Sequence, residues 1–286
     1  MNKLFLSIAC TVVFFVASAV ESAPIKAELF MPGGRSWKGS LIGRDGDWIE
    51  FSTGAGARPI RVGAGTIESL AFEVNIDSEK LSEMNSNREY QQIIDILDAT
   101  LSRFADYSDI SSNLTPYNSF LMELNYKVGN YKESLTTAKK LAQDDSTPDF
   151  QETGRIYLTL SLIGIGNIVE AEKVMHSFGW NAATLNASPA TLYITAKILE
   201  AKKEYQKAIE LAARIVALHS HSPEWMQPAE LLCAELYTKL GKYDSAEEVI
   251  NQIFMLYRDS DEDVAARKLK RQIATLRSQQ ETLNAD

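Results

Sequence analysis

Apolar and polar positions follow two different periods along the chain, and the change falls near Ile76. Before this point, short runs rich in β-branched and aromatic residues are separated by Gly and Asp, which is typical of short strands. After it, apolar residues recur at helical spacing. One such stripe is formed by Phe120, Leu121, Leu124 and Val128. The pattern predicts an α+β chain, with a β part followed by an all-helical part.

Five short strands are predicted in the β part, at residues 27–30, 37–42, 48–51, 59–62 and 67–72. Asp45-Gly46 stands between two of these runs and predicts a tight hairpin turn, because Gly tolerates positive φ and Asp nearly does. We expect the five strands to close into a small β-barrel over residues 24–76. The runs 39–51, 59–62 and 67–72 resemble those of small Sm-like barrels, some of which bind RNA.

Four stretches of the helical part repeat one pattern, beginning at Gly129, Gly166, Lys203 and Gly241 with spacings of 37, 37 and 38 residues. Apolar helical stripes flank each of these four positions. A period in this range predicts stacked helical hairpins, none of which can bury its apolar face alone. Residues 77–286 are therefore expected to form an α-solenoid.

The repeated residues resemble the tetratricopeptide repeat (TPR) pattern, in which a turn Gly is followed by Tyr two residues later and by Ala five residues later. The aromatic position holds Tyr131, Ile168, Tyr205 and Tyr243. The small position holds Ser134, Ala171, Ala208 and Ala246. Residues 87–101 resemble a degenerate first repeat, and residues 261–282 are predicted to form a last amphipathic helix that caps the stack.

The resemblance implies a concave groove, lined by the first helix of each hairpin, in which a protein or peptide binds. The predicted groove residues, transferred from the aligned turn positions, are Ser119, Glu123, Tyr126, Ile156, Leu160, Tyr193, Lys197, Glu200, Glu235 and Thr238. An alternative stays open for Ile156 and Leu160, which belong to the core if the local register differs by one or two residues.

The N-terminus carries the features of a secretory signal peptide. Lys3 precedes an apolar run over residues 4–16, and Ala17-Ser18-Ala19 offers small residues for cleavage after Ala19, with cleavage after Ala23 as the alternative. An uncleaved membrane anchor is the competing interpretation, but the run is short for a bilayer span. We therefore expect an exported protein, periplasmic or extracellular, associated with a bacterial cell envelope.

Charge and cysteine content restrict the possible partners. The chain has a net charge of −9, and removal of the signal would leave 28 basic and 38 acidic residues. Nucleic acid is a poor partner for this balance, because such binding depends on basic residues that neutralise phosphates. Only Cys233 would remain after cleavage, which excludes a disulfide within the mature chain.

No motif in the sequence indicates catalysis, a metal or a cofactor. His219 and His221 lack the further ligands of a closed tetrahedral site. Cys233 has no neighbouring imidazole in sequence and is predicted to be packed rather than nucleophilic. The sequence thus predicts a non-enzymatic scaffold that binds a protein or peptide. One alternative is a structural component that self-associates at the envelope, and another is an enzyme with a site between the two parts; neither has candidate residues.

Overall fold

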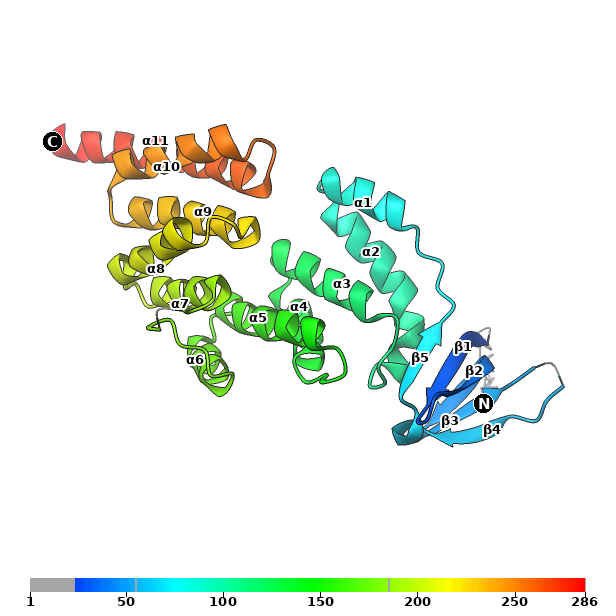
Figure 1. Ribbon diagram of the computed structural model, residues 1–286. Coiled ribbons are helices and arrows are strands. Elements are labelled where there is room, and N and C mark those ends of the chain that lie inside the picture. Colours follow the sequence, from blue (N-terminus) through cyan, green and yellow to red (C-terminus); the bar gives the residue numbers. More distant parts are fainter. Residues whose placement is uncertain (1–23, 55, 185, 286) are drawn as a thin grey trace, which may run out of the picture. The chain divides into compact units, whose positions relative to one another are not determined.

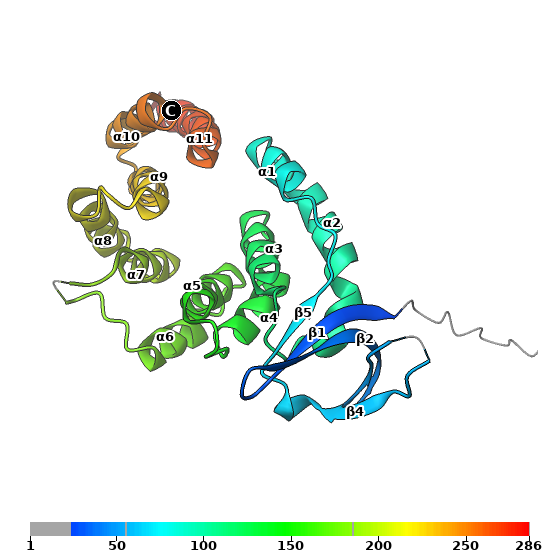
Figure 2. The same ribbon diagram turned by 45° about the vertical axis from the view of Figure 1, so that its right-hand side comes forward.

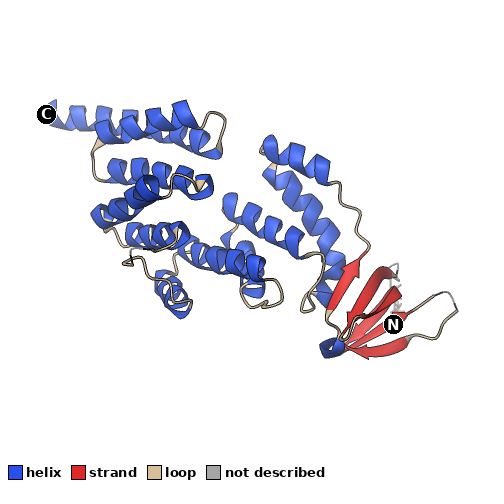
Figure 3. Cartoon of the chain, in the orientation of Figure 1, coloured by secondary structure: helices blue, strands red, loops and turns tan. Residues whose placement is uncertain are grey.

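The structure, a computed structural model, describes residues 24–54, 56–184 and 186–285. Internal contacts divide the chain into two units, of which the first ends at Glu73 and the second begins at Val74. The strands lie in the first unit and the α-helices in the second (Figures 1 and 3). The predicted signal segment lies outside the described residues.

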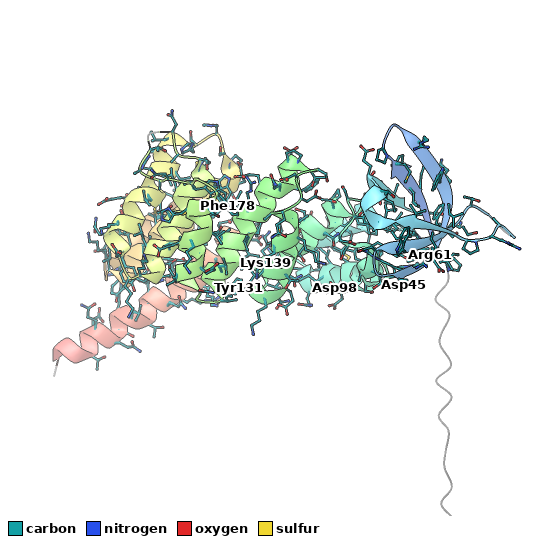
Figure 4. The ribbon with its side chains drawn as sticks, turned by 90° about the horizontal axis from the view of Figure 1, so that it is seen from below. Asp45, Arg61, Asp98, Tyr131, Lys139 and Phe178 are labelled. Carbon is teal, nitrogen blue, oxygen red and sulfur yellow. The ribbon has the colours of Figure 1, made fainter. Side chains whose placement is uncertain are left out.

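The first unit is a single antiparallel sheet, which confirms the five predicted strands. The strands are β1 (Ile25–Met31), β2 (Arg35–Asp45), β3 (Trp48–Ser52), β4 (Ile60–Gly63) and β5 (Ser69–Phe72), in the order β4-β3-β2-β1-β5. Leu29, Leu41, Ile49, Phe51 and Leu70 are at most 2% exposed and form its core. On the opposite face, Arg61 pairs with Asp45 at 2.8 Å (Figure 4).

Two details of the predicted sheet need correction. The strands form an open sheet in the described residues, because β4 pairs only with β3 and β5 only with β1. Both edge strands have only four residues, and the 3₁₀ helix η1 (Ala64–Thr66) turns the chain away from β4 towards β1. The hairpin turn also lies one residue later than predicted. Asp45 pairs with Trp48, so the loop is Gly46-Asp47, with Gly46 at φ 56°.

The second unit consists of helical hairpins, as the period predicts. Its first helices are α1 (Ser78–Ser86), α3 (Thr115–Lys127), α5 (Pro148–Gly164), α7 (Pro189–Ala201) and α9 (Pro223–Lys239). Their partners are α2 (Tyr90–Leu101), α4 (Tyr131–Leu141), α6 (Ile168–Ser177), α8 (Tyr205–Leu218) and α10 (Tyr243–Leu256), and α11 (Asp261–Ala285) follows. A 3₁₀ helix, η2 (Ser102–Tyr107), extends α2. No helix in the described ranges has the length and apolar character that crossing a bilayer requires.

The repeated turn residues share one backbone conformation. Gly129, Gly166, Lys203 and Gly241 have φ values of 88°, 80°, 64° and 70°, all in the left-handed region. Glycine is favoured there because it has no Cβ to clash with the following carbonyl group. Arg88, between α1 and α2, has φ 59° and precedes Tyr90 by two residues. The first hairpin therefore ends its first helix in the same way as the later ones.

Close packing of each second helix against its neighbours explains the repeated small residues. Ser134, Ala171, Ala208 and Ala246 are all 0% exposed, each on the second helix of its hairpin. Ser134 also accepts a hydrogen bond from the Ser161 hydroxyl at 3.0 Å, which satisfies two buried polar groups between α4 and α5. A larger side chain at these positions would force the neighbouring helices apart.

One carboxylate connects the two ends of the helical unit. Asp261, at the start of α11, accepts hydrogen bonds from Arg88 Nε at 2.9 Å and from the Tyr90 hydroxyl at 2.7 Å. Lys127 Nζ, at the end of α3, lies 2.7 Å from its second oxygen. Arg88 also donates to the carbonyl of Asp259. We call this set of contacts the Asp261 bridge. Its contacts to Arg88 and Tyr90 join residues that are more than 170 positions apart in the sequence.

Candidate protein-binding surface

The first helices of the hairpins form a continuous row. α3 contacts α5, α5 contacts α7, α7 contacts α9, and α9 contacts α11. Within the helical unit, Figure 2 shows these helices along the inner side of an arc, with α4, α6, α8 and α10 on its outer side. Pro148, Pro189 and Pro223 each begin one of the first helices, where a missing amide proton leaves no hydrogen bond unmade.

A charged cluster lies where α7 meets α9. Lys197 Nζ is 2.5 Å from one oxygen of Glu200, and Lys239 Nζ is 2.5 Å from the other. Glu200 is only 9% exposed. Burial by itself would raise its pKa, but the two lysines outweigh this and hold the pKa below the usual value for Glu. Glu200 is therefore charged and paired with both lysines at neutral pH.

Two other carboxylates on these helices are half-buried without a salt bridge. Glu123 lies on α3 and Glu235 on α9, and neither takes part in an ion pair with the residues that the structure describes. Burial raises the pKa of both groups. The charge of Lys127 opposes this at Glu123, and the charges of Lys197 and Lys239 oppose it at Glu235, whose pKa Glu200 raises further. Glu123 accepts only a long hydrogen bond, 3.5 Å, from the hydroxyl of Ser119.

Tyrosine rings lie between these charged groups. The ring of Tyr126 is 5.4 Å from that of Tyr157, edge to face, and 5.4 Å from that of Tyr131, tilted (Tyr131 is labelled in Figure 4). The ring of Tyr193 lies 5.7 Å from that of Trp225. Tyr126, Tyr157 and Tyr193 are half-buried, and burial raises the pKa of each phenol. These tyrosines therefore stay neutral and offer rigid, partly accessible rings.

We define the first-helix face by the half-buried and charged residues just described. Its members are Glu123, Tyr126, Tyr157, Tyr193, Lys197, Glu200, Glu235 and Lys239. The charge of Glu200 affects the pKa of both Tyr126 and Tyr193, and the charge of Glu235 affects that of Tyr193, so members on different helices lie within electrostatic reach of one another. The face combines aromatic rings with charges of both signs.

The structure places some predicted groove residues elsewhere. Leu160 is 4% exposed and packs with Met122 and Ile198 of the neighbouring helices, so for this residue the core alternative holds. Ile156 is half-buried and packs at the edge of the same cluster, as Tyr157 does. Ser119 is 3% exposed and therefore unavailable to a partner.

Thr238 is half-buried, and its hydroxyl donates to the carbonyl of Ala234 at 2.8 Å, which occupies its proton. Lys239, one position further on, is also a groove position by the alignment of turn residues. Tyr157 belongs to the face but is absent from the predicted positions. Tyr157 follows Ile156 directly, so a shift of one residue in the register of α5 would have identified it.

A separate pocket lies outside this face, between α1 and the start of α3. It has a volume of about 350 Å³, and Leu81, Tyr117 and Phe120 contribute most of its apolar lining. Ser78, Ser82, Asn85 and Pro116 complete the wall. Its polar groups are few and uncharged, so the pocket could hold an apolar group but has no charged side chain to bind or react with a ligand.

The described residues contain no arrangement of groups that indicates a reaction. No cluster of three or more His, Cys, Asp or Glu side chains suitable for a metal occurs in the described part of the chain. The imidazole rings of His219 and His221 lie 6.2 Å apart. Burial raises the pKa of the Cys233 thiol to about 12, so it is a poor nucleophile at neutral pH.

Comparison with known families agrees with the repeat architecture. Residues 192–273 match the family model described as tetratricopeptide repeat, which confirms the predicted family for this part of the chain. The match covers most of α7, all of α8 to α10 and about half of α11. A solved structure, the crystal structure of TTC0263, a thermophilic TPR protein in Thermus thermophilus, aligns with 66% of this chain and 94% of that chain, at 16% identity and a TM-score of 0.46. A search of curated proteins found no match.

Proposed function

We propose that this protein is an exported scaffold that binds a protein or peptide partner along its first-helix face. The tetratricopeptide repeats support a role in protein–protein interaction. The observation that carries the proposed binding mode is the row of half-buried tyrosine rings and charged groups on successive first helices. Export is proposed from the N-terminal sequence alone, with its positive start, apolar run and small residues at the cleavage position.

Affinity at such a face would come from a few anchors. Tyr157 and Tyr193 present large, rigid and neutral surfaces, which are common among the residues that dominate binding energy at interfaces. The pair of lysines on Glu200 is fixed in position before a partner arrives, so it lowers the entropy that binding must overcome. The positive and negative charges of the face would then favour partners whose own charges are complementary.

Site-specific photo-crosslinking tests the binding face. A photoreactive amino acid is placed at Glu235 on α9 in one variant and at Tyr157 on α5 in another. The control carries it at Glu248, an exposed residue of the outer helix α10. The expected result is the same crosslinked partner from both first-helix positions and none from Glu248. Adducts at Glu248 alone, or different random adducts at every position, would place the interaction elsewhere.

A reporter fusion tests export separately. Residues 1–23 are joined to an alkaline phosphatase that folds only outside the reducing cytoplasm, and the control replaces the apolar run with polar residues. Activity that depends on the apolar run supports export. Equal activity from both fusions would contradict it without affecting the proposed binding face.

A further inference from the structure

We infer that the partner presents Lys or Arg side chains to two cation-binding subsites on the first-helix face, an inference that rests on the proposed function. The α3 subsite consists of Glu123 with the rings of Tyr126 and Tyr157. The α9 subsite consists of Glu235 with the ring of Tyr193. Each subsite combines a carboxylate with neighbouring aromatic rings, and both features attract cations.

Neither carboxylate has a direct ion-pair partner among the described residues. Glu123 and Glu235 are half-buried, and lysines act on them only from a longer distance: Lys127 on Glu123, and Lys197 and Lys239 on Glu235. A half-buried carboxylate in this state loses hydration and gains only part of the compensation that a direct ion pair gives. An arriving ammonium or guanidinium group would supply that ion pair.

The lysines on this face, and Lys127 beside it, are already paired. Lys197 and Lys239 both bind Glu200, each at 2.5 Å. Lys127 binds Asp261 at 2.7 Å and lies 4.8 Å from the centre of the Tyr90 ring. None of them can move to Glu123 or Glu235 without breaking a short ion pair. These two carboxylates are therefore available to an external cation rather than to an internal one.

Aromatic rings lie near both carboxylates. The rings of Tyr126 and Tyr157 meet edge to face at 5.4 Å, and the charge of Glu123 reaches Tyr157. Tyr193 lies within reach of the charge of Glu235. Tyrosine rings bind Lys and Arg groups through the electron density on their faces, and the effect grows where water is excluded. The rings thus add to the attraction of each carboxylate.

Overall charge favours the same partner. The chain has a net charge of −9, so it attracts basic segments over distances comparable to the Debye length. An acidic partner would instead have to compete with Glu200 for Lys197 and Lys239, which both bind it. Charge complementarity therefore favours a basic segment over an acidic one.

Selection from displayed short random peptides tests the inference on the full mature chain. Bound peptides are sequenced, and the affinities of recovered peptides are measured by fluorescence anisotropy. The test variant is Glu123→Gln with Glu235→Gln, which keeps the shape of both side chains. The matched control is Glu210→Gln with Glu248→Gln, which changes net charge equally at exposed positions of the outer helices. Circular dichroism verifies that both variants fold.

We expect recovered peptides to be enriched in Lys and Arg, and to bind the test variant at least about tenfold more weakly, with the control variant nearly unchanged. Peptides without basic enrichment that still compete at the first-helix face would overturn the cation subsites and leave the proposed function standing. Equal weakening in both variants would show a nonspecific charge effect and also overturn the subsites. No recovered binder, or binders crosslinked only to the outer helices, would overturn both proposals.

Discussion

Replacement of Asp261 by Asn should destabilise the first and last hairpins together. The substitution keeps the size of the side chain but removes its charge, while Arg88 and Lys127 remain in place. In the folded protein these two cations and the Tyr90 hydroxyl all converge on this carboxylate. The variant therefore leaves two positive groups close together without their shared counter-charge.

The expected loss follows from the contacts and their exposure. Hydrogen bonds to charged groups contribute roughly 1.5–3 kcal/mol each when well shielded. The side chain of Asp261 is 32% exposed, as is that of Arg88, and that of Lys127 is 47% exposed, so solvent screens the interaction. Asn also keeps one oxygen as an acceptor. We therefore expect a total loss of about 1–2 kcal/mol in the free energy of unfolding.

Two measurements follow the perturbation. Urea denaturation followed by circular dichroism gives the loss of stability, and hydrogen exchange shows its location. The amides of α1 and α2 should exchange faster in the variant, because the bridge holds this hairpin to α11. Amides of the central helices α5 to α8 should change little.

The matched control is Asp244→Asn. Asp244 also accepts a bond from an arginine, Arg277, at 2.6 Å, but its side chain is 95% exposed. Its substitution should leave the urea midpoint unchanged within error, since exposed pairs contribute little. If both variants lose the same stability, or if exchange in α1 and α2 stays at the wild-type rate, the bridge does not hold the two ends together.

Three further predictions concern single positions. Lys203→Gly should stabilise the protein by about 0.5–1 kcal/mol in urea denaturation, because φ 64° strains a residue with a Cβ; a loss of stability would contradict this. Gly154→Ala should destabilise it by about 1–3 kcal/mol, since a Cβ would lie 2.5 Å from the main-chain nitrogen of Ala142; an unchanged midpoint would show that α4 and α5 can separate freely. Folding lowers the pKa of Glu200, so its ionised side chain stabilises the fold fully above the ordinary Glu pKa, and this stabilisation falls away as the pH decreases from about 4.5. Urea midpoints of wild type and Glu200→Gln should therefore converge in acid, and a constant difference would refute this.

The repeat architecture could be predicted from the sequence because its signals are local and periodic. A left-handed turn favours Gly wherever it occurs, so Gly129 and Gly241 mark the hairpins without knowledge of their neighbours. The buried small residues, such as Ala208, repeat for the same reason. The five strands were also predicted, because apolar and aromatic runs between Gly and Asp are a short-range pattern.

The remaining features depend on distant contacts or on small rotations. Whether Leu160 faces a partner or the core depends on the rotation of α5 against both neighbours, and the turn residue alone does not determine this. Closure of the sheet depends on the distance between its two edges rather than on the strands themselves. The Asp261 bridge joins groups more than 170 residues apart, and the sequence gives no sign that they meet.

The Asp261 bridge changes how this repeat protein should respond to shortening. A stack with free ends behaves as a linear array, in which a terminal unit can be removed at the expense of one interface. Here the two termini of the array support each other, so truncation before α11 would also loosen the hairpin at the opposite end. The stability of the helical unit therefore depends on the contact between its two ends as well as on the contacts between neighbouring helices.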